Sequence, residues 1–284
     1  MAWPSARYAA FRLVEAASRR LPPGMAVCIA ERLADGYACT AAADRAAIRH
    51  NLELLADQPA EFLAGRIREV FRHFARYLVE FFTMHDPDRV AVAVDGQAGL
   101  RAAQGMARGA IVLTAHLGNW EAGAVALRRL GFEVAAVALP HEDPALNVLF
   151  DRQRARCGVH VIPVGPTATP ACVRWLRQGG VLGLLGDQAY GADSVRVPFG
   201  RGLLRAPRGP AVLSLRTGAP VLPTFVIREA PGRLRMRISA AIAPEEACGP
   251  DRVADLTRRY AAALHEGIQR VPEQWIWLQR IETA

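Results

Sequence analysis

The chain has 284 residues, 51% of them hydrophobic, and carries a formal net charge of +8. This length is enough for one large domain with a sizeable core. The sequence lacks an apolar run of about 18 residues, which argues against a membrane-spanning helix, and Arg7 and Arg12 interrupt the place where a secretory signal would need its apolar segment.

The basic residues are all arginine, since the sequence contains no lysine. Guanidinium groups favour phosphates and anionic surfaces, so an anionic membrane or a phosphorylated substrate is a fitting partner. Nucleic acid is not favoured, because the sequence has no binding motif for it and no dense basic run. Five scattered cysteines without a CxxC pair argue against a disulfide framework or a zinc site, and for a reducing compartment.

The N-terminal part of the chain, residues 1–84, has helical patterns throughout. The expected helices cover 5–21, the segment after Pro22 and Pro23 to about residue 35, 42–56 and 59–82. In the last of these, Phe71, Phe74 and Leu78 belong to an apolar stripe with three- and four-residue steps, which is typical of a core helix. The first helix instead mixes aromatic residues with arginines, a composition suited to a membrane interface. Both interpretations stay open, because different helices can have different roles.

From His85 onward, short apolar strands alternate with amphipathic helices, which predicts an α/β sheet with helices on its faces. The expected strands cover 90–94, 110–114, 134–138, 159–162, 181–185, 195–197 and 221–227, followed by a pairing segment at 233–239. The expected helices lie near Leu100 and cover 120–130, 144–156, 168–177, 207–216 and 253–270. We therefore predict one α/β domain: a mixed, largely parallel central sheet flanked by helices over 85–284, with a helical, membrane-facing cap over 1–84.

The stretch IVLTAHLGNWEAG at residues 111–123 stands out from these elements. A β-branched and apolar strand delivers His116 into a short glycine-containing loop, and an alanine-rich helix follows at once. Glu121 lies five residues after the histidine, so the two side chains can meet only if the backbone bends between them. The alternative is a loop histidine of no chemical role and a carboxylate that stabilises the helix N-terminus.

Several catalytic classes have no support, because the sequence has no GxSxG elbow, HExxH, Walker loop or GxGxxG. What remains is a histidine with a carboxylate nearby. A neutral imidazole can take a proton from a hydroxyl, and a carboxylate on its other nitrogen fixes the tautomer and stabilises the imidazolium. No serine or cysteine lies close in sequence to serve as nucleophile. The hydroxyl can therefore belong to a substrate, which predicts a transferase.

The segment HLGNWE resembles the HxxxxD/E motif of the lysophospholipid acyltransferase superfamily. The likeness is closest to its lipid A biosynthesis acyltransferase family, which also includes phosphatidylinositol mannoside acyltransferases. Further blocks extend the resemblance over most of the chain: IRHNLEL (48–54), NVLFDRQRARCG (147–158), GDQAYG (186–191), VPFG (197–200), RGPAVLSLRTGAPVLP (208–223) and PEQWIWL (272–278). Six ordered blocks make chance similarity a poor explanation.

The resemblance implies transfer of an acyl chain from an acyl carrier protein or coenzyme A thioester directly to a lipid hydroxyl, without a metal, a cofactor or an acyl-enzyme. His116 matches the catalytic base of the family and Glu121 its acidic partner. Asp187 falls where this group carries an acid implicated in a charge relay. Because strand ends gather at one edge of an α/β sheet, Asp187 can approach His116; the alternative is a turn-forming aspartate.

Five further residues are candidates for substrate binding. Arg152 and Arg156, four apart on one helix, share a face that can grip a phosphate or a phosphorylated sugar. Arg205 and Arg208 flank the VPFG loop close to an expected helix N-terminus, a favourable place for an anion. Solvation is the alternative for each arginine. Asn119 completes the set, with capping of the following helix as its alternative.

The chain also departs from the family it resembles. Typical members of the lipid A branch begin with a membrane-spanning helix, whereas charges interrupt the corresponding region here, so we expect peripheral or monotopic attachment to the cytoplasmic face of the inner membrane. The VPFG loop is one Phe shorter than usual, and Gln279 and Arg280 stand in place of a histidine-arginine pair. These changes leave the chemistry intact and concern the substrate. Two competing functions stay open: hydrolysis of acyl thioesters or lysolipids with the same dyad, and an inactive protein that binds anionic membranes.

Overall fold

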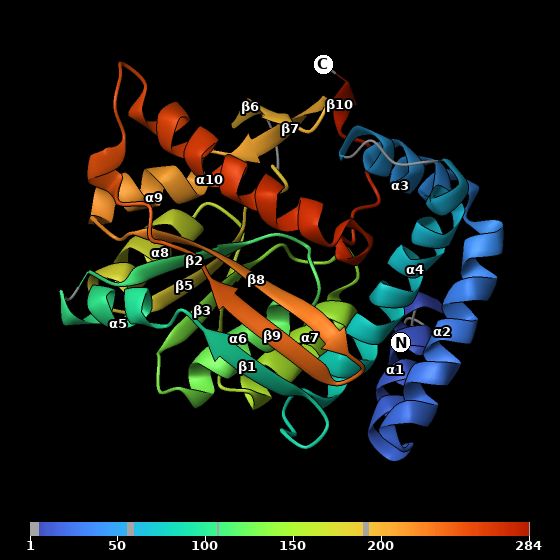
Figure 1. The fold of residues 1–284 in the computed structure, drawn as a ribbon. Helices are drawn as coiled ribbons and strands as arrows, with labels where there is room; N and C mark the ends of the chain where they lie inside the picture. Colours follow the sequence, from blue (N-terminus) through green and yellow to red (C-terminus); the bar gives the residue numbers. More distant parts are fainter. Residues whose placement is uncertain (1–5, 56–59, 107, 190–192, 284) are drawn as a thin grey trace.

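The computed structural model describes residues 6–55, 60–106, 108–189 and 193–283. Four N-terminal helices pack against one side of an α/β core (Figure 1). They are α1 (Ala6–Arg20), α2 (Pro23–Thr40), α3 (Ala42–Leu55) and α4 (Ala60–Thr83). Helix α2 runs five residues past its expected end at 35, because Ala38 is buried against α3 and α4 and its packing carries the helix through Gly36.

Helix α4 is the centre of the cap. Its first half packs with α2 and α3 in a small apolar cluster that includes Ile67 and Phe71. Its second half inserts Phe81 and Phe82 into the cluster beneath the main sheet, where Phe81 stacks on Phe150. Most of the apolar stripe therefore faces a core, as its three- and four-residue period predicts, but Phe74 is exposed. None of the described helices is long and apolar enough to cross a membrane.

The main sheet has seven strands in the order β1-β9-β8-β2-β5-β3-β4. Their bounds are β1 Ala91–Asp95, β2 Ala110–Thr114, β3 Val134–Ala138, β4 His160–Pro163, β5 Val181–Leu185, β8 Val221–Ala230 and β9 Arg233–Ile238. Every pair of neighbours is parallel except the β8/β9 hairpin. The predicted fold class, α/β with a mixed and largely parallel sheet, is confirmed.

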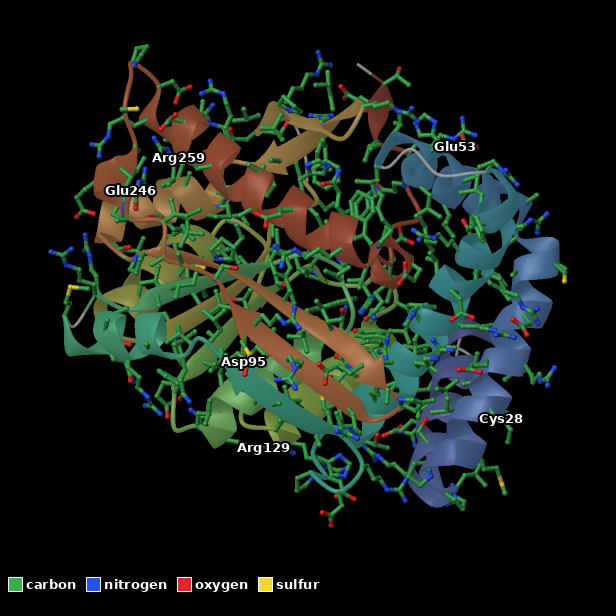
Figure 2. The ribbon with its side chains drawn as sticks, in the orientation of Figure 1. Cys28, Glu53, Asp95, Arg129, Glu246 and Arg259 are labelled. Atoms are coloured by element: carbon green, nitrogen blue, oxygen red, sulfur yellow. The ribbon has the colours of Figure 1, made fainter. Side chains whose placement is uncertain are left out.

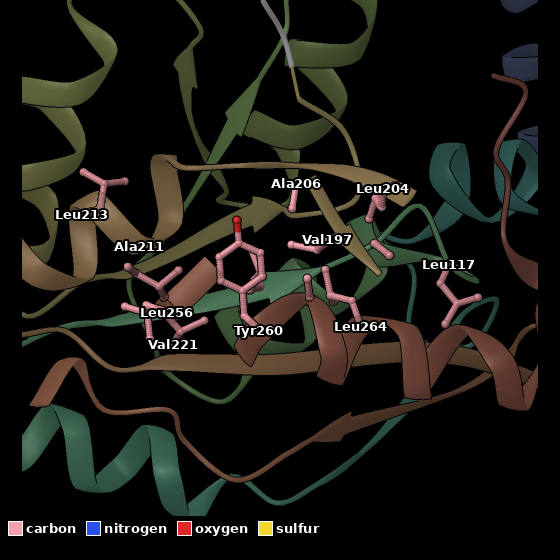
Figure 3. Packing of buried hydrophobic residues seen from close by; sticks show 14 of the residues in the cluster. Leu117, Val197, Leu204, Ala206, Ala211, Leu213, Val221, Leu256, Tyr260 and Leu264 are labelled. Carbon is pink, nitrogen blue, oxygen red and sulfur yellow. The ribbon is translucent and has the colours of Figure 1, made fainter. Parts of the chain in front are cut away.

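Helices cover both faces of this sheet, and β2 separates the two cores by strand alternation. Val112 faces α4, α5 (Ala98–Gly105), α6 (Trp120–Arg129) and α7 (Pro144–Arg156). Leu113 faces α8 (Ala168–Arg177), α9 (Gly209–Thr217) and α10 (Arg252–Arg270). Figure 3 shows the second cluster, with Tyr260 and Leu264 of α10 among apolar side chains of the strands.

A small second sheet was not expected from the sequence. It consists of β6 (Ser194–Phe199), β7 (Gly202–Pro207) and β10 (Glu282–Thr283) in the order β10-β7-β6. The predicted VPFG loop is thus the end of a strand and its turn, where Gly200 has φ +62° and a Cβ would lie 2.2 Å from the carbonyl oxygen of Leu54. The following helix begins at Gly209 instead of 207, so Arg205 lies within a strand and not beside a helix N-terminus.

Two short 3-10 helices, Pro244–Glu246 and Pro272–Gln274, flank α10. The second one leads into the C-terminal segment, which crosses from the carboxyl edge of the main sheet to β10. This segment and the loop after β2 build the site described next.

Candidate active site

The loop after β2 bends sharply and is held from two sides. Gly118 has φ +63°, and a Cβ at this position would lie 1.9 Å from the carbonyl oxygen of Val226, so only glycine fits. The backbone N–H of Gly118 donates to the carbonyl oxygen of Gln274 at 3.0 Å, and that of Asn119 donates to Val226 at 2.9 Å. The loop is therefore fixed to β8 and to the C-terminal segment.

This bend directs His116 to Asp187, which follows β5 at the same edge of the sheet. His116 Nδ1 and Asp187 Oδ1 are 3.0 Å apart, while Oδ2 accepts the backbone N–H of His116 and the indole N–H of Trp275, both at 2.9 Å. Burial of Asp187 opposes its ionisation, but the adjacent imidazole and these hydrogen bonds outweigh it and lower its pKa. Asp187 thus meets His116, as the positions of the strand ends predict.

The tautomer of His116 follows from this arrangement. An ionised carboxylate can only accept hydrogen bonds, so Nδ1 carries the proton and Nε2 has a free lone pair. The His116 side chain is 18% exposed, and it lines the main cavity of the described residues. The ring also lies against Trp120 and Trp277, which restrict its rotation.

Glu121 was expected to orient His116, but the structure pairs it with a different residue. Its carboxylate accepts from Arg154 of α7, with Nη2 to Oε1 at 2.6 Å and Nε to both oxygens at 3.2 Å. Glu121 lies in the first turn of α6, and this turn faces α7 and not the histidine. The partner that orients His116 is Asp187. The ion pair of Glu121 and Arg154 is nearly buried and lines the cavity.

Sequence reasoning missed Arg154, although it left a signal. Leu146 and Phe150 are buried on α7 at a spacing of four, and Arg154 continues the same row. An arginine at the next step of an apolar row faces inward, where it needs an anionic partner.

Asn119 does not bind substrate in this arrangement, because its side chain is fully buried. Its Oδ1 accepts the backbone N–H of Ala122 at 3.0 Å, which makes it the N-cap of α6. Its Nδ2 donates to Oε2 of Glu80 at 2.9 Å. The capping alternative is the correct one.

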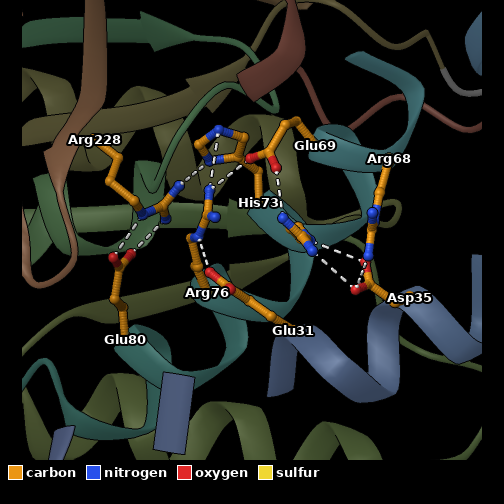
Figure 4. A network of polar contacts seen from close by, with 9 residues as sticks. Glu31, Asp35, Arg68, Glu69, His73, Arg76, Glu80 and Arg228 are labelled. Atoms are coloured by element: carbon orange, nitrogen blue, oxygen red, sulfur yellow. Dashed lines mark hydrogen bonds and ion pairs between the residues drawn. The ribbon is translucent and has the colours of Figure 1, made fainter. Parts of the chain in front are cut away.

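Glu80 belongs to a buried polar network that the sequence analysis also missed (Figure 4). Arg228 of β8 donates to both oxygens of Glu80, at 2.7 and 2.6 Å, and to Nδ1 of His73 at 2.7 Å. The side chains of Glu80 and Arg228 are each 3% exposed. The available signal was two polar residues, seven apart, within the apolar stripe of α4. Through Asn119, this network connects the helical cap with the loop that carries His116.

The four predicted arginines do not reach the cavity. Arg152 and Arg156 are exposed on the outer side of α7. Arg205 donates to Ser194 within the small sheet, and Arg208 lies 3.4 Å from Asp193 and from Asp251. None of the four is among the cavity-lining residues that the structure describes. Their role in substrate binding therefore has no support from the cavity and stays a prediction.

The cavity itself has a volume of about 880 Å³ and lies at the carboxyl edge of the sheet. Strands β3 and β5 pair only as far as Ala136 and Gly183, and the cavity occupies the space where they separate. Most lining side chains are apolar, and the polar ones include His116, the ion pair of Glu121 and Arg154, His141 and Asp193. A long apolar ligand with a polar reacting end fits such a site.

Comparisons with known proteins agree with this geometry. A model of the bacterial lipid A biosynthesis acyltransferase family matches residues 7–281. The chain belongs to this family. The names of the family and of its relatives indicate an acyltransferase, so the predicted membership and enzyme class are confirmed.

Two mycobacterial relatives are phosphatidylinositol mannoside acyltransferases. The protein of Mycobacterium tuberculosis (strain CDC 1551 / Oshkosh) is 31% identical over 198 residues, which cover 68% of this chain and 59% of the relative. The chain thus spans about three fifths of that relative. The protein of Mycolicibacterium smegmatis is 27% identical over 240 residues, covering 82% and 77%.

Among solved structures, the 1-acyl-sn-glycerophosphate acyltransferase of Thermotoga maritima aligns with a TM-score of 0.44 at 14% identity. The alignment covers 89% of this chain and 99% of that one. A likeness at this level supports no inference about the site.

Among the described residues, no group of three or more His, Cys, Asp or Glu side chains is placed to hold a metal ion.

Proposed function

We propose that this acyltransferase moves a fatty acyl chain from an acyl carrier protein or coenzyme A thioester to a hydroxyl of a membrane glycolipid such as a lipid A precursor. His116 acts as the general base. The observation that carries the proposal is the hydrogen bond of Nδ1 to buried Asp187, at 3.0 Å, which leaves Nε2 free in a largely apolar cavity.

The reaction follows from this geometry. Nε2 of His116 takes the proton of the acceptor hydroxyl while the oxygen attacks the thioester carbonyl. The tetrahedral intermediate then expels the thiolate, which receives the proton back from the imidazolium. Asp187 stabilises that imidazolium, because its negative charge is buried 3.0 Å from Nδ1. No metal or other cofactor takes part in this scheme.

The cysteine in the cavity supports direct transfer over an acyl-enzyme. Cys172 lines the cavity, but burial raises the pKa of its thiol to about 11. The thiol therefore stays protonated near neutral pH and is a weak nucleophile. The attacking oxygen then belongs to the acceptor.

Glu121 has a different place in the proposal from the one expected. Held by Arg154, its carboxylate forms part of the cavity wall and can accept a hydrogen bond from a hydroxyl of the acceptor headgroup. We therefore assign Glu121 to acceptor binding, with Arg154 as the residue that holds its carboxylate in place.

The outer side of α2 supports attachment to the membrane surface. Apolar side chains at four-residue steps are 43 to 65% exposed there: Met25, Ile29, Leu33 and Tyr37. Cys28, beside this stripe, points away from the protein (Figure 2). An exposed apolar stripe on a helix of an arginine-rich protein fits the interface of an anionic membrane. We place the enzyme peripherally on the cytoplasmic face of the inner membrane.

The test compares His116→Ala with His141→Ala, since both histidines line the cavity. The purified protein is incubated with an acyl thioester and vesicles that contain the acceptor glycolipid, and lipids are analysed by mass spectrometry. His116→Ala should keep its circular dichroism spectrum and lose about two to four orders of magnitude in transfer rate, as expected for loss of a general base. His141→Ala should retain most of the activity.

Other outcomes would overturn the proposal. Free fatty acid as the only product, with acceptor present, would favour the hydrolase. Vesicle binding without turnover on any thioester would favour the inactive membrane-binding protein. Near-normal transfer by His116→Ala would rule out the general base.

A further inference from the structure

A second cavity, with lining residues distinct from those of the active site, lies between α3, α4 and the C-terminal segment. Its volume is about 400 Å³. The lining residues are Ala42, Arg45, Ala46, Arg49, His50, Glu53, Ile67 and Arg280. Figure 2 marks its position through Glu53 on α3. We call it the arginine pocket, because three of its side chains are guanidinium groups and the small alanines leave room between them.

The arginine pocket joins two parts of the sequence that the active site did not use. The IRHNLEL block forms the wall on α3, and the segment after PEQWIWL forms the opposite wall. Asn51 connects them: Nδ2 donates to the carbonyl oxygen of Gln279 at 2.7 Å, and Oδ1 accepts the N–H of Ile281 at 3.0 Å. His50 Nε2 lies 3.0 Å from the carbonyl oxygen of Ile281. These contacts hold the backbone of Arg280 against α3.

The charges of this pocket are unbalanced. Arginine is always protonated, so the described lining has three positive side chains and one carboxylate, that of Glu53, which is 3.9 Å from Arg49. Arg45 is fixed by hydrogen bonds to the carbonyl oxygens of Ala38 and Cys39, at the end of α2. Within the described part of the chain, Arg280 has no carboxylate within ion-pair distance. The pocket therefore has an excess of positive charge, and hydrogen bonds hold the Arg45 side chain and the backbone of Arg280 in place.

The arginine pocket is also close to the reaction centre. The backbone N–H of Ile276 donates to the carbonyl oxygen of His116 at 2.7 Å, and the ring of Trp277 lies 5.7 Å from the imidazole. Arg280 follows Trp277 by three residues, so their Cα atoms are at most about 11 Å apart. A group bound in the pocket is thus within reach of a substrate whose reacting end is at His116.

We propose that the arginine pocket binds a phosphate group carried by one of the two substrates. Guanidinium forks match phosphate oxygens, and a concave site with three of them favours a multiply charged anion over a single carboxylate. The phosphate belongs either to the carrier arm of the acyl donor or to the headgroup of the acceptor lipid. The binding of phosphate follows from the pocket alone, whereas its assignment to a substrate rests on the proposed function.

Inorganic pyrophosphate is the probe for binding, measured by isothermal titration calorimetry at constant ionic strength. Arg49→Gln and Arg280→Gln should each weaken binding about tenfold, the usual effect of losing a charged hydrogen bond. Glu53→Gln should strengthen binding, because it removes the one carboxylate among the described residues that line the pocket. Arg237→Gln, at an exposed arginine of β9, is the matched control and should bind as the unmodified protein does.

Absence of pyrophosphate binding, or equal weakening in the control, would overturn the proposal. Steady-state kinetics then identify the source of the phosphate: a higher KM for the acyl donor in Arg280→Gln assigns it to the donor, and a higher KM for the lipid assigns it to the acceptor. Unchanged KM values for both would overturn the assignment to a substrate. His116→Ala should bind pyrophosphate normally, so failure of the proposed reaction is distinguishable from failure of the pocket.

Discussion

At the residue scale, Asp187 determines which nitrogen of His116 is basic. Two fixed donors, the backbone N–H of His116 and the indole of Trp275, both point at Oδ2, so only Oδ1 remains for the imidazole. The carboxylate is thereby oriented as well as ionised. The histidine depends on this orientation, because its proton must be on Nδ1 for Nε2 to accept one.

Asp187→Asn should therefore inactivate the enzyme without unfolding it. The two donors would hold the amide oxygen at the Oδ2 position and turn the NH₂ group toward Nδ1. Nδ1 would then accept a hydrogen bond and Nε2 would carry the proton, which is the wrong tautomer for a base. We expect kcat to fall by about two to four orders of magnitude with little change in KM.

The control for this substitution is Asp193→Asn, at an exposed carboxylate that also lines the cavity. Its kcat should stay close to that of the unmodified enzyme. Comparable activity of the two variants would contradict the tautomer argument.

Residue types and strand ends were sufficient to predict His116 and Asp187, because the carboxyl ends of parallel strands converge. The partner of Glu121 could not be predicted, since a spacing of five residues does not say which way the first turn of α6 faces. That Arg152 and Arg156 lie outside the cavity has a similar origin: a helix presents several faces, and only the apolar row of α7 indicates that Arg154 faces inward.

At the element scale, helix α4 packs in the core and also supports the loop that carries His116. Its apolar period was predictable from the sequence. The contacts of its buried polar residues were not, because their partner Arg228 lies on β8, about 150 positions away in the sequence. The same limit applies to the sheets. Individual strands can be predicted from local composition. Their order cannot, because contacts between distant segments determine the place of β9 between β1 and β8 and the pairing of β6, β7 and β10.

The buried histidine of α4 makes stability depend on pH. Burial, together with Arg228 and Arg76, lowers the pKa of His73 to about 3, against 6.5 in the unfolded chain. Between these values the unfolded chain binds a proton that the folded protein does not, so the free energy of unfolding decreases as pH falls. The expected slope is at most about 1.4 kcal/mol per pH unit. The free energy of unfolding loses no contribution to the protonation of His73 only above about pH 6.5.

His73→Gln should reduce this acid sensitivity, because glutamine offers Arg228 an acceptor but does not titrate. Urea unfolding at pH 6.5 and at pH 4.5 measures this sensitivity. Between the two pH values, the free energy of unfolding should fall by less in the variant than in the unmodified protein. All other titrating groups are common to both, so the difference isolates His73. Equal decreases in the two proteins would contradict the interpretation.

At the scale of the whole molecule, the cap and the core form one connected structure. Ion pairs link Asp35 of α2 with Arg68 and Arg72 of α4 (Figure 4). Through Asn119, the network around Glu80 continues from α4 to the loop of His116. These contacts fix the exposed apolar stripe of α2 relative to the active site. If the stripe binds a bilayer, they also determine the orientation of the cavity relative to the lipid.

Leu33→Glu tests this arrangement, since Leu33 is the most exposed residue of the α2 stripe at 65%. Losing the burial of a leucine side chain and adding a negative charge should lower binding to anionic vesicles by at least about tenfold. Met106→Glu is the control: Met106 is 54% exposed but follows α5, at the opposite side of the molecule from α2 (Figure 1). Co-sedimentation with anionic vesicles measures the membrane binding of both variants. The Met106 variant should bind as the unmodified protein does, because its side chain faces away from the bilayer in the proposed orientation. Equal loss in both variants would mean that net charge, and not the stripe, determines attachment, and equal retention would place the membrane contact on another face.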